Sequence, residues 1–178
     1  MKKELLKILK KDAFFKKRIK LSSGKMSNYY VDVRRVSLTP EGVYLISSLI
    51  WRAIKNDKID AVGGPTLGAD PIIGGVCMVA RRTRKDLKGF LIRKTPKKHG
   101  SQKLIEGREL RKGSRVVVID DVATSGSSLI KSIEILQAQK IKIVKAVTVI
   151  DREEGATQNL EKLKCPLVSL FTKSDFYK

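Results

Sequence analysis

Short apolar runs and longer amphipathic segments alternate along the chain. The apolar runs are rich in β-branched and aromatic residues, and they predict strands over residues 29–33, 59–62, 90–92, 116–119 and 143–150. Between several of them lie segments in which apolar residues recur every three or four positions, which predicts helices. Strands that alternate with helices are typical of a parallel sheet. We therefore expect an α/β fold with a central, mostly parallel sheet flanked by helices.

Helix boundaries can be placed from local signals. The first residues form an amphipathic helix rich in lysine, and the polar turn over 21–28 followed by strand 29–33 predicts a short hairpin. Thr39 precedes Pro40, which is typical of a helix N-terminus, and the apolar stripe that follows predicts an end near Asn56. Asp70 and the proline after it should open another helix.

The apolar run 116–119 leads directly into two acidic residues, Asp120 and Asp121. Four consecutive β-branched residues predict a strand that is buried on both faces, as in parallel sheets. Burying two adjacent carboxylates would cost several kcal/mol each unless they were paired. We therefore expect both side chains to point out of the carboxyl edge of the sheet, where ligands bind in open α/β folds.

A loop of small residues separates these acids from the next helix. Residues 123–127 read Ala-Thr-Ser-Gly-Ser, and apolar residues recur at helical spacing from Leu129 onwards. Ser127 or Ser128 is expected to cap this helix, whose N-terminus would stabilise an anion. The loop suits a phosphate, and the acids suit sugar hydroxyls or a hard cation such as Mg²⁺. A ribose phosphate fits both parts; the alternative is an ordinary strand, turn and capped helix.

The composition is compatible with one domain. The chain has 178 residues, of which 42% are hydrophobic, and it contains neither a secretion-type apolar segment nor a run of transmembrane length. We expect a cytoplasmic protein without a membrane partner. Cys77 and Cys165 are far apart and should be free thiols, and His99 is the single histidine, which excludes clusters of zinc ligands. A Ser-His-Asp hydrolase is also disfavoured, because no G-x-S-x-G motif occurs.

The chain is strongly basic, with a net charge of +20. Such a charge favours either nucleic-acid binding or attraction of anionic small substrates. Lysines are spread over the whole chain, which weakens the first explanation. The most polar basic segment, residues 93–103, is too long for a common connection between strands. It is either a lid over a site or a solvated basic loop.

Residues 116–128 resemble the phosphoribosyl pyrophosphate (PRPP) motif of the type I phosphoribosyltransferases, in which two acids precede a Thr/Ser/Gly loop. Neither the nucleotide P-loop nor the G-x-G-x-x-G fingerprint occurs in the chain. The resemblance implies a single domain over residues 1–178. A small hood would be formed by about residues 1–40 and 153–178, and residues 94–110 would form a mobile catalytic loop.

Further segments resemble one family of this group, the orotate phosphoribosyltransferases. They are an N-terminal Ser-Gly-Lys signature within 21–32, a glycine loop over 63–71, the basic motif R-K-x-x-K-x-H-G over 93–100 and the motif D-R-x-E-G-A over 151–156. These segments span most of the chain. For the basic segment, the match in spacing favours a catalytic loop over a solvated one.

The resemblance implies a role for each matching residue. Lys97, His99 and Asp121 would be catalytic, and Thr124 and Arg152 would contact orotate. Arg152 could instead form a surface ion pair with Glu153 or Glu154, and Lys25 could be a solvated hairpin lysine. The residues implied to bind PRPP are Lys25, Arg93, Lys94, Lys97, His99, Asp120, Asp121, Val122, Ala123, Thr124, Ser125, Gly126, Ser127 and Ser128.

The implied reaction transfers ribose 5-phosphate from PRPP to orotate, with Mg²⁺ carried mainly by PRPP and no dedicated set of protein ligands. The resemblance also implies a homodimer in which Lys94, Lys97 and His99 act in the neighbouring subunit's site. One alternative keeps the fold but changes the base that accepts the sugar. The other is a PRPP-sensing regulator that binds nucleic acid through its basic surface; the basic catalytic-type loop argues against it.

Overall fold

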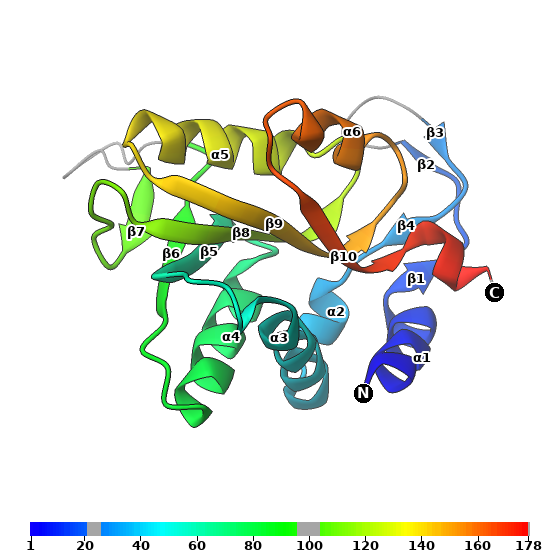
Figure 1. The fold of residues 1–178 in the computed structure, drawn as a ribbon. Helices are drawn as coiled ribbons and strands as arrows, with labels where there is room; N and C mark the ends of the chain where they lie inside the picture. Colours follow the sequence, from blue (N-terminus) through cyan, green and yellow to red (C-terminus); the bar gives the residue numbers. More distant parts are fainter. Residues whose placement is uncertain (21–25, 96–103, 178) are drawn as a thin grey trace.

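The computed structural model describes residues 1–20, 26–95 and 104–177 and is built around a six-stranded sheet with helices on both faces (Figure 1). The strand order is β10-β9-β8-β5-β6-β7, and all neighbours are parallel except β6 and β7. This confirms the predicted fold class. In chain order the strands are β5 (Ala61–Pro65), β6 (Lys88–Ile92), β7 (Ile105–Gly107), β8 (Arg115–Ala123), β9 (Lys142–Asp151) and β10 (Leu167–Thr172).

Strand β8 is buried on both faces, as its four β-branched residues predict. Val117 and Ile119 belong to one core cluster, and Val116 and Val118 belong to the other. All four side chains are fully buried, which contributes about 1.5–3 kcal/mol for each of them. The strand continues for four residues beyond Ile119, and it therefore carries the two acids to the edge of the sheet.

Helices α3 (Pro40–Ile54) and α4 (Asp70–Arg82) cover one face of the sheet, and α5 (Ser127–Ala138) covers the other (Figure 1). The hydroxyl of Thr39 accepts a hydrogen bond from the N–H of Gly42, so the predicted cap of α3 is confirmed. Helix α1 (Lys2–Asp12) packs against α3 and the short α2 (Arg34–Ser37). Helix α6 (Ala156–Glu161) follows β9. No helix in the described ranges is long and apolar enough to cross a bilayer.

The two ends of the chain meet beside the sheet. Strands β1 (Phe14–Phe15) and β4 (Tyr30–Val31) pair with each other next to the C-terminal turn η1 (Lys173–Phe176) (Figure 1). Phe14 stacks on Phe176 with ring centroids 5.0 Å apart. Strands β2 (Ile19–Lys20) and β3 (Met26–Ser27) form a second antiparallel pair, in which β3 lies inside the predicted turn. The predicted strand over 29–33 is β4, and its antiparallel partner is β1. Aromatic side chains from both termini therefore share one cluster.

The structure differs from the sequence-based expectations in three strands. β5 begins two residues later than predicted and includes Gly63, Gly64 and Pro65, which were assigned to a loop. β7 lies inside the segment expected to be a loop, and β10 was not predicted at all. β7 has only three residues, too few to show a periodicity, and its pairing with β6 is what defines it.

Candidate active site

The carboxyl ends of β8 and β9 lie side by side. Their register pairs Asp120 with Thr148 and Ala123 with Asp151. The N–H of Arg152 donates to the carbonyl of Ala123 at 2.9 Å. Since parallel strands end at one edge of a sheet, the segments that follow β8 and β9 flank the same site.

Asp120 and Asp121 lie within β8 rather than beyond its end. Asp120 is only 7% exposed, and Asp121 is partly buried. The N–H of Asp121 donates to Oδ1 of Asp120, and the N–H of Val122 donates to Oδ1 of Asp121, both at 2.9 Å. Both side chains line the cleft at this edge, as expected, but Asp120 is buried there, which the general cost of burying a carboxylate had disfavoured. Its hydrogen bond from the backbone offsets part of the cost of burial.

The two carboxyls have raised pKa values. Burial is the main cause for both, and the charge of Asp121 raises the pKa of Asp120 further. Hydrogen bonds and the positive charge of Arg34 oppose the rise in the pKa of Asp121, and Lys94 opposes that of Asp120. In the absence of ligand the pair therefore holds protons more tightly than free carboxyls do, and donors or cations brought by a ligand would favour its ionised form.

The loop after β8 ends at a glycine that starts helix α5. Gly126 has a φ of 78° and is the N-cap residue, and no side chain caps the helix. The predicted cap by Ser127 or Ser128 is wrong, because Ser127 already lies inside the helix. The side chain of Asn159 donates to the carbonyl of Ser125 at 3.0 Å and holds the loop. The helix N-terminus is thus left without a side-chain acceptor, which suits an anionic ligand.

A glycine-rich segment forms the facing wall. A Cβ added at Gly64 would lie 1.8 Å from the carbonyl oxygen of Ile119, and one added at Gly68 would lie 2.4 Å from the carboxylate carbon of Asp121. Only glycine permits these approaches. The two walls enclose a cleft of about 260 Å³ lined by Val31, Asp32, Arg34, Pro65, Thr66, Leu67, Gly68, Lys94, Asp120, Asp121, Val122 and Ser128.

The structure brings most of the predicted PRPP-binding residues to this edge. Those that line the cleft are Lys94, Asp120, Asp121, Val122 and Ser128. Arg93 and Ser127 line an adjoining cavity of about 290 Å³. Ala123 is buried, and Thr124, Ser125 and Gly126 connect β8 to α5. Lys25, Lys97 and His99 lie outside the described residues.

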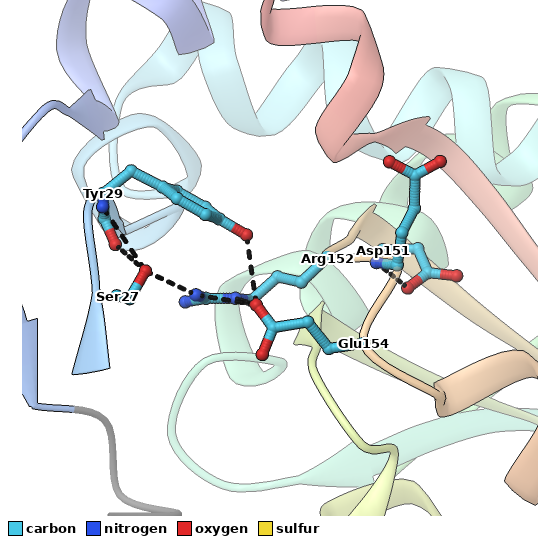
Figure 2. A network of polar contacts seen from close by, with 6 residues as sticks. Ser27, Tyr29, Asp151, Arg152 and Glu154 are labelled. Carbon is cyan, nitrogen blue, oxygen red and sulfur yellow. Dashed lines mark hydrogen bonds and ion pairs between the residues drawn. The ribbon is translucent and has the colours of Figure 1, made fainter. Parts of the chain in front are cut away.

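Arg152 is buried beside this edge, with 4% of its surface exposed. Its Nε donates to Oε1 of Glu154 at 3.0 Å, and its Nη2 donates to Oγ of Ser27 at 3.1 Å (Figure 2). The guanidinium lies over the ring of Tyr29, 4.4 Å from the centroid. The ion pair with Glu154 that the sequence left open as an alternative exists, but it is not a surface pair, because Arg152 is buried.

Tyr29 ties this network to the N-terminal segment. Its hydroxyl donates to Oε1 of Glu154 at 3.3 Å, and its ring stacks on Phe14. Burial raises the pKa of Tyr29 to about 12, so the hydroxyl stays a donor at neutral pH. The contacts of Arg152 use Nε and Nη2, and no described residue accepts from Nη1. The network therefore fixes a cation whose remaining donors suit a planar carboxylate.

Sequence reasoning missed several residues of the site. Ser27 and Tyr29 lay inside a matched segment, but nothing in their spacing links them to Arg152. Arg34 was not singled out, although it forms a two-bonded ion pair with Asp32 in the cleft wall. The only local signal for this pair is the sequence Asp-Val-Arg, which is too short to be specific.

Comparison with known proteins identifies the family. Residues 35–171 match the phosphoribosyl transferase domain. An orotate phosphoribosyltransferase of Aquifex aeolicus is 42% identical over 175 residues, which cover 98% of this chain and 92% of the relative. The chain belongs to the orotate phosphoribosyltransferase family. An orotate phosphoribosyltransferase of Methanosphaera stadtmanae is 36% identical, with 99% of this chain and 97% of the relative covered.

Solved orotate phosphoribosyltransferases have the same fold. The Mycobacterium tuberculosis protein in complex with Fe(III) dicitrate matches with a TM-score of 0.86 at 32% identity, and 98% of each chain is covered. The M. tuberculosis protein in complex with PRPP matches with a TM-score of 0.83 at 29% identity, and 99% of each chain is covered. In the present member of the orotate phosphoribosyltransferase family, the acid pair belongs to β8 and the buried arginine follows β9.

Proposed function

We propose that this chain transfers the ribose 5-phosphate group of PRPP to a nitrogen of orotate, giving orotidine 5′-monophosphate and pyrophosphate in UMP synthesis. The observation that carries the proposal is the adjacency of an acid pair and phosphate-type loop on β8 to a buried arginine after β9. The backbone hydrogen bond between Arg152 and Ala123 joins the two parts directly. A sugar phosphate on the first part would thus lie beside a base on the second.

The sugar phosphate is proposed to bind along the end of β8. The 5′-phosphate would accept hydrogen bonds from the loop over 124–128 and from the start of α5, where the backbone N–H groups and the helix dipole favour an anion. Asp120 and Asp121 would accept hydrogen bonds from the ribose hydroxyls. Asp121 is the more accessible of the two acids and is the one assigned a catalytic role, because it can stabilise positive charge on the sugar.

Orotate is proposed to bind through its carboxylate to Arg152. A guanidinium held on one edge by Glu154 and on one face by Tyr29 has little rotamer freedom left to lose on binding. Thr124, on the loop next to Ala123, would contact the base. A base without a carboxylate would leave the buried guanidinium of Arg152 with fewer hydrogen-bond partners, and such a base should therefore bind more weakly.

The leaving group is proposed to be stabilised by basic residues. The transition state resembles an oxocarbenium ion, so pyrophosphate gains charge as its bond to the anomeric carbon breaks. Arg93 and Lys94 stand where the basic segment leaves β6, and Lys94 lines the cleft. Lys97 and His99 would act from the residues that follow. Donors that strengthen their contacts in the transition state lower the barrier, and each reduction of about 1.36 kcal/mol raises the rate tenfold.

Mg²⁺ is proposed to arrive with PRPP. Within the described ranges, no group of three or more His, Cys, Asp or Glu side chains could hold a metal ion. Asp120 and Asp121 nevertheless supply oxygen atoms, which suit a hard cation directly or through water. When bound, the ion would neutralise charge on the pyrophosphate group.

The assembly is proposed to be a cytoplasmic homodimer in which the basic segment of one subunit completes the site of the other. We propose further that residues 1–40 and 153–178 form a hood over a single domain; the contact of Phe14 with Phe176 supports this. Lys94 lines the cleft of its own chain. The proposal of action in trans therefore rests on Lys97 and His99.

The test is turnover with PRPP and Mg²⁺. Orotate should disappear by its ultraviolet absorbance while pyrophosphate is released, and uracil, adenine and hypoxanthine should react far more slowly. A folded chain without turnover of any base would refute the proposal. Faster turnover of another base would reassign the acceptor, and salt-sensitive nucleic-acid binding without turnover would favour the regulator.

A further inference from the structure

Arg34 is a fixed cation in the wall of the cleft. Its Nε donates to Oδ1 of Asp32 at 2.8 Å, and its Nη2 donates to Oδ2 at 3.1 Å. The backbone N–H of Arg34 also donates to Oδ1 of Asp32, at 3.2 Å. No described residue accepts from Nη1, and 46% of the side chain is exposed. The pair with Asp32 thus orients the guanidinium and leaves donors available to a ligand.

Arg34 faces the part of the cleft next to the glycine-rich segment. It lines the cleft together with Leu67, Gly68 and Asp121, but it is absent from the residues that line the adjoining cavity at Ser127. The charge of Arg34 lowers the pKa of Asp121, although its ion pair among the described residues is with Asp32. Arg34 is therefore close to the acid pair, and it lines the cleft beside the glycine-rich segment but not the adjoining cavity.

The carboxylates that line the cleft make a cation beside the glycine-rich segment necessary for an anionic ligand to bind. Residues 63–68 carry no charged side chain, and Leu67 is an apolar residue that is 71% exposed. Three carboxylates line the cleft, whereas Arg34 and Lys94 are the only lysine or arginine side chains among its described lining residues. A strongly anionic ligand beside three carboxylates is repelled unless fixed cations contact it.

We propose that Arg34 donates hydrogen bonds to the pyrophosphate group of PRPP and that Asp32 positions it for this contact. The inference rests on the proposed function, because the pyrophosphate group enters the cleft only as part of PRPP or as a product. A planar guanidinium with a fixed orientation matches phosphate oxygens, and it loses little conformational entropy on binding. Because pyrophosphate gains charge as it leaves, the contact also stabilises the transition state.

The test compares two probes that report on the two ends of PRPP. Calorimetric titration should show that Arg34→Gln weakens binding of inorganic pyrophosphate with Mg²⁺ at least tenfold, which is about 1.4 kcal/mol, and changes binding of ribose 5-phosphate less than about twofold. Arg35→Gln is the matched control, since Arg35 lies over the ring of Phe15, 4.8 Å from its centroid. It should leave both affinities and the turnover unchanged.

Three outcomes would overturn the inference. They are an unchanged pyrophosphate affinity in Arg34→Gln, an equal loss for both probes, and a wild-type chain that binds ribose 5-phosphate but not pyrophosphate. A wild-type chain that binds neither probe would refute the proposed function first and the inference with it. Thermal unfolding of Arg34→Gln should match that of the wild type, because the side chain is exposed.

Asp32→Asn tests the positioning role. Removal of a negative charge from the cleft would by itself strengthen pyrophosphate binding. If Asp32 orients Arg34, the substitution should instead weaken pyrophosphate binding about threefold or more and leave the KM for orotate unchanged. Tighter pyrophosphate binding in Asp32→Asn would overturn the positioning role.

Discussion

Gly68→Ala should damage catalysis without unfolding the protein. The added Cβ would lie 2.4 Å from the carboxylate carbon of Asp121, so this carboxylate must retreat by about 1 Å to reach ordinary contact distance. A displacement of about 1 Å at a reacting centre costs about 100-fold in rate, equivalent to about 2.7 kcal/mol. The loss of stability should be about 1 kcal/mol or less, because the group that moves is the end of a side chain.

Two other glycines of the chain provide the controls. An added Cβ at Gly74, in α4, would meet nothing within 4 Å, so Gly74→Ala should retain full activity and gain up to about 1 kcal/mol from helix propensity. Gly64→Ala would place its Cβ 1.8 Å from the carbonyl oxygen of Ile119 in β8, which should cost about 3 kcal/mol or more.

The assay pairs steady-state kinetics with urea unfolding of each variant. Gly68→Ala should lower kcat/KM for PRPP about 100-fold while its free energy of unfolding stays close to that of the wild type. Wild-type kcat/KM in this variant would show that the position of Asp121 does not limit the reaction. A loss of stability as large as that of Gly64→Ala would show that the clash is absorbed by the backbone instead.

Three further variants test other parts of the site. Arg152→Lys keeps the positive charge but loses the planar guanidinium held by Glu154. The KM for orotate should therefore rise tenfold or more, while the KM for PRPP stays constant. An unchanged KM for orotate would show that Arg152 does not contact the base. Because burial raises the pKa of Asp120, this carboxyl adds stability at pH values below its ordinary pKa of 3.8, and that stability is lost as pH rises through the raised value. Asp120→Asn should therefore raise the Tm at neutral pH, with a gain that shrinks on acidification, and a gain independent of pH would contradict this account. Lys97→Ala should lower kcat far more than the affinity for PRPP, and mixing it with Asp121→Asn subunits should restore part of the activity; no restoration would contradict action in trans.

Strand β8, which lines the cleft, and the loop after it were predictable because their signals are local. Val116 to Ile119 predict a doubly buried strand, and the acids and small residues follow within the next ten positions. The cap of α5 was misassigned because the left-handed backbone of Gly126, which starts the helix, leaves no trace in side-chain periodicity.

The support of Arg152 could not be predicted from the sequence. Ser27 and Arg152 are 125 positions apart, and their contact exists only because the N-terminal hairpin packs beside the end of β9. The burial of Asp120 was also missed, since the general cost of burying a carboxylate ignores the hydrogen bond that its own neighbour supplies. Strand β10 alternates apolar and polar residues weakly, and its pairing with β9 defines it.

The two halves of the site are encoded in different ways along the chain. The proposed sugar-phosphate half lies in one short stretch of sequence, so it can be kept intact while the rest of the chain changes. The proposed base half is a network of Ser27, Tyr29, Arg152 and Glu154, which come from opposite ends of the chain. If these assignments hold, substitutions around Ser27 and Tyr29 should alter which base is accepted without changing the segment proposed to hold the sugar. In the proposed arrangement, the choice of acceptor can therefore vary independently of the segment that holds the 5′-phosphate and ribose of the donor.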